Sequence, residues 1–427
     1  MSKNQNNWTA DPMGSPMPLR RRWFFWGGLL LGICLGGLTA FWTIRGTKLP
    51  PATSSTLVVQ PPPGVEKQNG PWGDLEISDI TIERPDEYIG RIVPPPEAGI
   101  WFFGAGHGRE QILQLFKSVI LSESQRRSLS DVSRWQIQTN GIRITPGREL
   151  LLRLDPRTRA TLYGVLARFP ENPNHVTPHM FPKARAMDWF QHSGLVAETM
   201  SMVKSVLYER GEMMCFSDLQ ILQDISTEDE RRRLIKTLSR TPAVLAGLRV
   251  APGANVEAMT GYWGRFGRTG SIRSLLTALS QKPDGGNVDI SNLLPPFVRE
   301  RLNLYPDAPP DEGSGRSPDC FWTALNFLRE PPDDRMIEEP YRMGVLKSDY
   351  EATKGPPQLG DLLVFFDSRN VPFHACVYVA GRVVFTKNGA TVFSPWILMR
   401  DSDVIAIYST TRTPRVLVLR PKIPPQS

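Results

Sequence analysis

Cys320 is the residue of this sequence with the clearest capacity for covalent chemistry. The stretch Ser317-Pro318-Asp319-Cys320 is typical of a helix start, with Ser317 as the cap and Pro318 at the first helical position. Cys320 then falls in the first turn, where unpaired backbone amides stabilise a thiolate, the nucleophilic form of cysteine. The sequence therefore predicts a nucleophilic thiol at position 320.

A cysteine nucleophile needs a base close by, and that base needs a partner that orients it. His374 is the only histidine that follows Cys320, so it is the candidate base. The side-chain carbonyl of Asn388 can accept a hydrogen bond from the imidazole, whereas the ammonium group of Lys387 cannot accept one. The predicted catalytic residues are therefore Cys320, His374 and Asn388.

One helix and three strands must position these residues. Apolar residues at helical spacing follow Cys320 as far as Leu328. Apolar runs bounded by turn residues predict strands at 359–366, 373–379 and 383–386. We expect the helix that bears the cysteine to pack on an antiparallel sheet that bears the histidine.

At these residues the sequence resembles the NlpC-like, papain-fold cell-wall peptidases. That family typically has Asp-Cys at a helix start, a Gly-Asp-Leu-Val-x-Phe strand, a strand that runs from His to Tyr, and then a polar residue on the next strand. The matching segments here are Asp319-Cys320, Gly360 to Phe366, His374 to Tyr378, and Lys387 or Asn388. The resemblance covers roughly residues 310–410. It implies a cysteine hydrolase that cleaves an amide bond in cell-wall peptide.

Two departures from the family pattern leave alternatives open. Bulky Phe321-Trp322 replace the Ser-Gly that often follows the nucleophile, which would reshape the substrate groove. Cys376 lies two residues from His374 and so shares its strand face. Cys376 either packs as a small apolar residue or forms a disulfide with Cys320, and a disulfide would block a thiolate mechanism. A retained fold with lost chemistry is the alternative to an active pair.

Residues 23–44 carry no charged side chain and predict one N-terminal transmembrane helix. At about 1.5 Å per residue they reach about 33 Å, enough to cross a hydrocarbon core. An arginine triplet at 20–22 favours residues 1–22 on the cytoplasmic side and the soluble part outside. A cleaved signal peptide is the alternative, although its apolar region is usually only about 7–15 residues long. Small residues on one helix face would also permit a homodimer: Gly28, Gly32 and Gly36.

The rest of the chain divides by composition. Residues 45–73 are rich in proline and predict a linker. Residues 74–305 predict a mostly helical domain, with a β-hairpin near 135–144 where Asn140-Gly141 separates two alternating segments. Residues 306–427 predict the papain-like domain. The expected fold class is therefore α+β, with an N-terminal membrane helix, a mostly helical middle region and a C-terminal helix-on-sheet domain.

Charge, cysteine count and histidine spacing argue against several classes of ligand. The net charge of +7 comes without a basic cluster interleaved with aromatic residues, so no nucleic-acid partner is expected. The four cysteines include no Cys-x-x-Cys pair, and neither zinc nor another cofactor is expected. His175 and His179 are four apart, but Pro173 and Pro178 argue against a helix that would present both to a metal.

The sequence thus predicts a membrane-anchored cysteine hydrolase that acts on amide bonds of cell-wall peptide in the bacterial envelope. Its expected partners are membrane lipid at residues 23–44 and peptidoglycan or envelope peptide. The first alternative is a non-catalytic binding or scaffold protein that uses the papain-like fold. The second is a thiol acyltransferase, because an amine or alcohol can resolve the same thioester.

Overall fold

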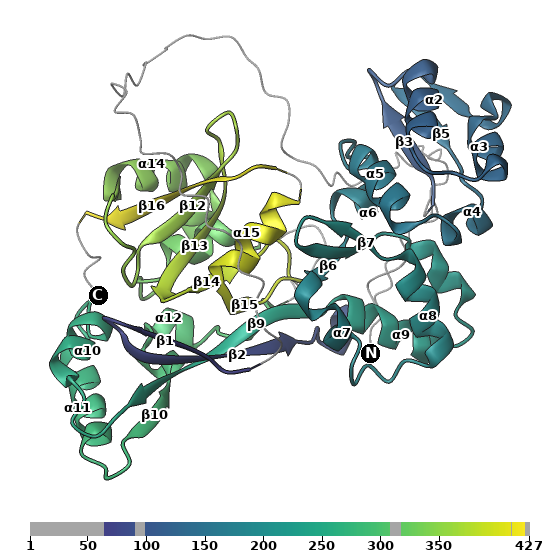
Figure 1. The fold of residues 1–427 in the computed structure, drawn as a ribbon. Helices are drawn as coiled ribbons and strands as arrows, with labels where there is room; N and C mark the ends of the chain where they lie inside the picture. Colours follow the sequence, from purple (N-terminus) through teal and green to yellow (C-terminus); the bar gives the residue numbers. More distant parts are fainter. Residues whose placement is uncertain (1–63, 90–98, 308–316, 411, 423–427) are drawn as a thin grey trace, which may run out of the picture. The chain divides into compact units, whose positions relative to one another are not determined.

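The computed structural model describes residues 64–89, 99–307, 317–410 and 412–422 (Figure 1). These residues form a mixed α and β structure with four sheets. No helix among them is long and apolar enough to span a membrane. The predicted fold class is therefore wrong in its membrane helix, because no described helix spans a membrane, whereas the mixture of helices and sheets is consistent with the predicted α+β class. The predicted span at 23–44 and its three glycines lie outside the described residues.

The largest sheet of the described chain is antiparallel, in the order β11-β16-β12-β13-β14-β15. Its strands are β11 (Tyr350–Ala352), β12 (Leu362–Phe366), β13 (Pro372–Ala380), β14 (Val383–Lys387), β15 (Trp396–Arg400) and β16 (Arg415–Pro421). Helix α13 (Cys320–Leu325) contacts β13 and β14, while α14 (Glu339–Asp349) precedes β11 and α15 (Asp401–Ser409) follows β15. A helix that bears Cys320 therefore packs on an antiparallel sheet that bears His374.

Both faces of the sheet are buried along most of β12, β13, β14 and β15. Side chains on one face share a core with α13, among them Val364, Ala375, Val377 and Phe385. Side chains on the other face, among them Phe365, Cys376 and Tyr378, share a core with Val404 of α15. Because successive side chains of a strand point to opposite faces, neighbouring residues of β13 belong to different cores.

A second antiparallel sheet has the order β1-β2-β9-β10 and continues the core on the α13 side. Its strands are β1 (Glu66–Gly70), β2 (Gly73–Ile82), β9 (Thr241–Val250) and β10 (Gly286–Asp289), and the helices α10 (Val256–Trp263), α11 (Thr269–Ser280) and α12 (Pro296–Arg299) lie between or after them. β1 occupies part of the segment that the sequence assigned to the linker. Gly73 closes the β1–β2 turn with a φ of +100°, which glycine adopts without strain.

The part of the middle region from residue 83 to residue 240 is an insertion between two strands that pair with each other. Ile82, at the end of β2, pairs directly with Thr241, at the start of β9. Two three-stranded sheets lie in between, β3-β5-β4 and β6-β8-β7. Their strands are β3 (Trp101–Gly104), β4 (Gln136–Gln138), β5 (Gly141–Ile144), β6 (His179–Pro182), β7 (Tyr208–Arg210) and β8 (Met213–Phe216). The helices of this region are α1 (Asp86–Ile89), α2 (Arg109–Ser118), α3 (Glu123–Ser130), α4 (Arg148–Leu152), α5 (Pro156–Leu166), α6 (Pro173–Val176), α7 (Ala186–Trp189), α8 (Ala197–Val206) and α9 (Glu228–Leu238).

The short strands of the middle region show why the sequence indicated mainly helices there. Strands of three or four residues are too short to show a period of two, and a buried run such as Met213–Phe216 looks the same in a helix or a strand. Asn140-Gly141 does mark a hairpin of β4 and β5, but Gln138 pairs with Gly141, so Thr139 and Asn140 form the turn. Gly141 is needed for close packing instead, because a Cβ there would stand 2.3 Å from the carbonyl oxygen of Phe103.

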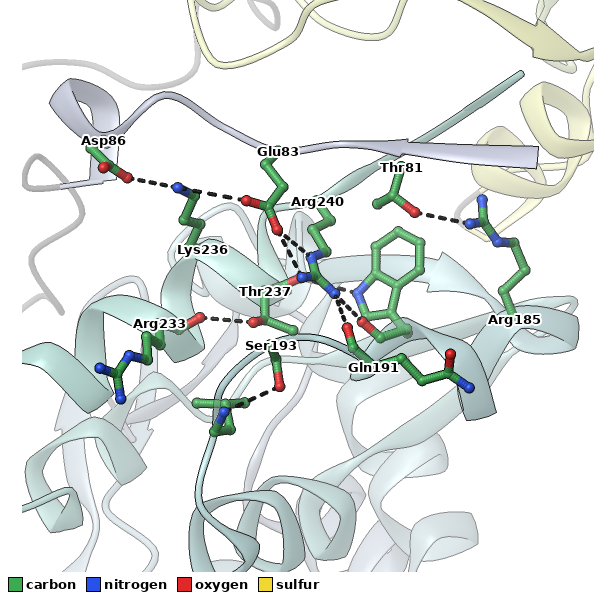
Figure 2. A network of polar contacts seen from close by, with 12 residues as sticks. Thr81, Glu83, Asp86, Arg185, Gln191, Ser193, Arg233, Lys236, Thr237 and Arg240 are labelled. Carbon is green, nitrogen blue, oxygen red and sulfur yellow. Dashed lines mark hydrogen bonds and ion pairs between the residues drawn. The ribbon is translucent and has the colours of Figure 1, made fainter. Parts of the chain in front are cut away.

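Polar contacts join the two ends of this insertion (Figure 2). Glu83 accepts from the Nη2 of Arg240 at 2.7 Å, one residue beyond the Ile82–Thr241 pair. Arg240 also donates through Nη1 to the carbonyl oxygen of Trp189 at 2.6 Å. Lys236 of α9 forms an ion pair with Asp86 of α1 at 2.9 Å. These contacts hold together the two chain segments from which the middle region extends, residues 82–86 and 236–241, which we call the neck.

Candidate functional site

Cys320 begins helix α13, but its local setting differs from the predicted one. Asp319, not Ser317, is the N-cap: its carboxylate accepts from the backbone N–H of Trp322 at 2.8 Å. Cys320 is therefore the first residue of the helix and not the third. Arg342 pairs with the other oxygen of Asp319 at 2.7 Å and thereby fixes the cap. The Cys320 side chain is buried in the core that α13 shares with the sheet.

This environment disfavours the thiolate of Cys320. Burial and, to a smaller extent, the adjacent carboxylate of Asp319 raise its pKa to about 12. A hydrogen bond from the backbone of Ala375 and the charge of Arg342 act in the opposite direction but do not prevail. At neutral pH the thiol is therefore protonated, and the protonated form is a poor nucleophile.

His374 is fully buried on β13 and contacts the α15 side of the sheet. Its ring stacks on the ring of Tyr408, with centroids 4.1 Å apart and planes at 26°. The ring of Phe365 meets it at 5.2 Å, edge to face. Burial lowers the pKa of the imidazole to about 3, so the ring is neutral at physiological pH. A buried, neutral ring that packs between aromatic side chains is part of the hydrophobic core.

The nearest polar neighbours of His374 form a short chain. Nε2 of the imidazole lies 3.3 Å from Oγ1 of Thr386, and the Thr386 hydroxyl donates to Oδ1 of Asn388 at 3.0 Å. A hydroxyl has one proton to donate, so Thr386 accepts from the imidazole, which therefore carries its proton on Nε2. Nδ1 is buried and has no partner among the described residues. Asn388 thus reaches the histidine only through Thr386.

Cys320 and His374 lie on opposite faces of the sheet. Ala375 belongs to the core of α13 and bonds through its backbone to the Cys320 thiol. His374 is the preceding residue on β13 and points the other way, together with Cys376. The structure thus brings His374 toward Asn388 but places neither of them with Cys320.

Lys387 is an ionisable strand residue on the Cys320 side of the sheet. It is fully buried, and its Nζ donates to the carbonyl oxygens of Gly389 at 2.9 Å and Thr391 at 2.7 Å. Burial lowers the pKa of the ammonium group to about 8, while the nearby carboxylate of Asp319 acts to raise it. The two carbonyl contacts hold the turn after β14, which is a structural role.

The alternatives for Cys376 can also be read from its position. Its Sγ lies 3.9 Å from the carbonyl oxygen of Leu363, on the face away from α13. Cys215, Cys320 and Cys376, the cysteines within the described ranges, are all free thiols. Cys376 therefore packs as a small apolar residue.

The sequence missed a buried polar cluster in the middle region. His175 is buried beside Tyr163, and His179 belongs to β6 and not to a helix with it. Arg159 and Asp218 form a fully buried ion pair behind these rings. The only available signal was an arginine at a helical position that proved to face inward, and a single sequence does not reveal that.

No protein-family model matches the chain, and neither a curated protein nor a solved structure matches it.

Proposed function

We propose that this chain is a binding protein whose NlpC-like C-terminal domain recognises peptide without cleaving it. The observation that carries the proposal is the placement of Cys320 and His374 on opposite faces of one sheet. A base on the far side of a strand cannot take a proton from the thiol, because general-base catalysis needs direct or water-bridged hydrogen-bond contact. The peptide class of ligand rests on the family resemblance alone.

The protonation states support the same proposal. A thiol with a pKa of about 12 and an imidazole with a pKa of about 3 are both neutral at pH 7. An activated pair shows the reverse pattern, with the thiol pKa lowered by a nearby imidazolium. Hydrolysis and acyl transfer both start from the thiolate, so the arrangement disfavours both reactions.

An active pair would require a different strand register. A slip by one residue would turn every side chain of β13 to the other face, which would bring His374 to α13. The same slip would place Cys376 and Tyr378 in the core shared with α13, where Ala375 and Val377 now lie. The β12–β13 register, with Val364 opposite Ala375 and Phe365 opposite His374, opposes such a slip because both faces are packed.

Thiol reactivity tests the proposal. The protein is treated with iodoacetamide between pH 6 and 9, and labelling is followed at each cysteine by mass spectrometry. We expect Cys320 to label more slowly than a free thiol, with no inflection in this pH range. We expect Cys320→Ala to leave the rates of the other cysteines unchanged, and His374→Ala not to slow labelling at Cys320. Fast labelling at Cys320 that slows in His374→Ala would overturn the proposal.

Peptidoglycan supplies the second test. Purified insoluble peptidoglycan is incubated with the protein and sedimented, and the supernatant is analysed for released muropeptides by chromatography. We expect the protein to sediment with the polymer, and no fragments to appear in wild type or in Cys320→Ala. Release of fragments by wild type but not by Cys320→Ala would establish hydrolysis instead, and absence from the pellet would remove this ligand class.

A further inference from the structure

The turn between β12 and β13 carries exposed arginines at one end of the large sheet. Phe366, the last residue of β12, pairs with Arg415, the first residue of β16. Arg415 is exposed, and its Nη2 donates to Oδ1 of Asn370 in the turn at 2.9 Å. Arg369 of the turn and Arg412, which precedes β16, are also exposed. We call Arg369, Arg412 and Arg415 the turn arginines.

Two of the turn arginines lie over phenylalanine rings. The guanidinium carbon of Arg415 is 5.1 Å from the centroid of the Phe366 ring, and that of Arg412 is 4.8 Å from the centroid of the Phe373 ring. Phe366 packs against the core on the α13 side and Phe373 against the core on the α15 side, so the two arginines flank the end of the sheet. A ring contact occupies the face of a guanidinium group and leaves the N–H donors at its edge for other partners.

Arg412 and Arg415 have no carboxylate partner. Neither makes an ion pair within the described part of the chain, and the hydrogen bond of Arg415 goes to a neutral amide. Arg335 is the contrasting case, because it is also exposed and stacked, on Tyr341, but pairs with Asp333 at 2.8 Å. The charges of Arg412 and Arg415 are therefore available to an anion from outside the chain.

The carboxylate of the turn itself, Asp367, is engaged by the backbone. Its Oδ1 accepts from the N–H groups of Arg369 and Val371, each at 2.9 Å, and the Asp367 side chain is only 13% exposed. Its other oxygen lies 3.5 Å from Nη2 of Arg369, whose side chain remains 71% exposed. The positive charges of the turn arginines therefore exceed the negative charge beside them, and Val371 adds an exposed apolar side chain.

We propose that the turn arginines bind an acidic peptide, whose carboxylates accept from the guanidinium groups of Arg412 and Arg415. This inference rests on the proposed function, peptide recognition by the C-terminal domain, and adds the surface and the charge of the ligand. A guanidinium fork matches the planar geometry of a carboxylate. An anionic lipid surface fits less well, because docking to a membrane relies on a large apolar face and the turn exposes one large apolar side chain, Val371.

The test measures fluorescence anisotropy of a labelled hexaglutamate peptide with the full-length protein, and the matching hexaglutamine peptide is the uncharged probe. We expect saturable binding of hexaglutamate that weakens as NaCl rises from about 50 to about 500 mM, and no binding of hexaglutamine. Arg412→Gln and Arg415→Gln should each weaken binding about two- to fivefold, and the double variant about tenfold. Arg415→Lys keeps the charge but loses the fork, so it should recover only part of the affinity lost in Arg415→Gln.

Arg249→Gln is the matched control, because Arg249 is an exposed arginine on β9 of the second sheet and its replacement removes the same charge elsewhere. We expect its affinity for hexaglutamate to equal that of wild type. Circular dichroism checks that each variant is folded.

Equal affinity in wild type and the double variant would overturn this inference and leave the proposed function standing, with the peptide bound at another surface. Absence of hexaglutamate binding to wild type would also overturn it. The same holds if the variants lose binding only to vesicles that contain phosphatidylglycerol, since the surface would then serve lipid. Sedimentation with peptidoglycan judges the proposed function separately from these outcomes.

Discussion

The imidazole of His374 is stacked on the phenol ring of Tyr408, with 4.1 Å between the ring centroids. Tyr408 belongs to α15, so the histidine joins β13 to the helix that covers the far face of the sheet. The ring of Phe373, next to His374, also meets Tyr408, at 5.8 Å. This histidine contributes to the stability of the domain through aromatic contacts.

Replacement of Tyr408 by leucine should therefore destabilise the protein. We expect a loss of about 1–3 kcal/mol in the free energy of unfolding, from the lost aromatic pairs and the smaller buried area. Tyr408→Phe keeps the ring and is expected to lose much less. Urea unfolding followed by tryptophan fluorescence measures both, and an equal loss in the two variants would show that the hydroxyl, and not the stack, is what matters.

Stability should also depend on pH through Asp403, at the start of α15. Burial raises the pKa of this carboxyl to about 6, from 3.8. The folded state therefore holds the proton more tightly than the unfolded state, and stability is lost as the pH rises from about 4 to about 6.

The matching variant is Asp403→Asn, which cannot ionise. One pKa unit corresponds to about 1.4 kcal/mol. The free energy of unfolding of Asp403→Asn minus that of wild type should therefore be larger at pH 7.5 than at pH 4, by about 1–3 kcal/mol. Thermal and urea unfolding across this range measure the difference. A difference between the two proteins that is the same at both pH values would contradict the assignment.

Arg240 should be the most sensitive position in the neck of the middle region. Its side chain is 9% exposed and binds Glu83 as well as two backbone carbonyl groups. We expect Arg240→Gln to reduce the free energy of unfolding by about 1–3 kcal/mol. Arg233→Gln is the control, because the Arg233 side chain is 53% exposed and should change stability by no more than about 0.5 kcal/mol. Similar losses in both variants would argue against this role of the neck contacts.

The buried pair of Arg159 and Asp218 gives a larger expected effect. Asp218→Asn would leave the guanidinium buried without its counter-charge, at a cost of about 3–5 kcal/mol in the free energy of unfolding. Glu209→Gln removes one partner of a half-exposed pair with Lys183 and should cost less than about 1 kcal/mol. Chemical denaturation separates the two outcomes, and a mild effect of Asp218→Asn would mean that water reaches Arg159.

The sequence located the elements around Cys320 better than it could relate them in space. Buried strands bounded by turn residues are visible as apolar runs, and the parity of His374 and Cys376 on one strand face follows from simple alternation. The sequence does not show which face of β13 meets α13. Both faces of β13 are apolar and both are covered, by α13 and α15, so the pattern carries no sign that distinguishes them.

The middle region shows the second limit of the sequence. Its strands have three or four residues, and the partners of a strand such as β6 arrive from β8, more than thirty positions later. Buried arginines such as Arg159 look like solvated residues in the sequence, since their burial depends on a carboxylate that only the fold brings near.

The direct pairing of Ile82 with Thr241 has a consequence for how the chain can be dissected. The two strands on either side of the neck are already hydrogen-bonded neighbours, so residues 83–240 are a topological insertion whose removal leaves two adjacent strand ends. A two-residue Asn-Gly turn in their place would convert β2 and β9 into an ordinary hairpin. Because closing a short turn costs less chain entropy than closing a long one, the shortened protein should assemble its sheets faster than the full chain does.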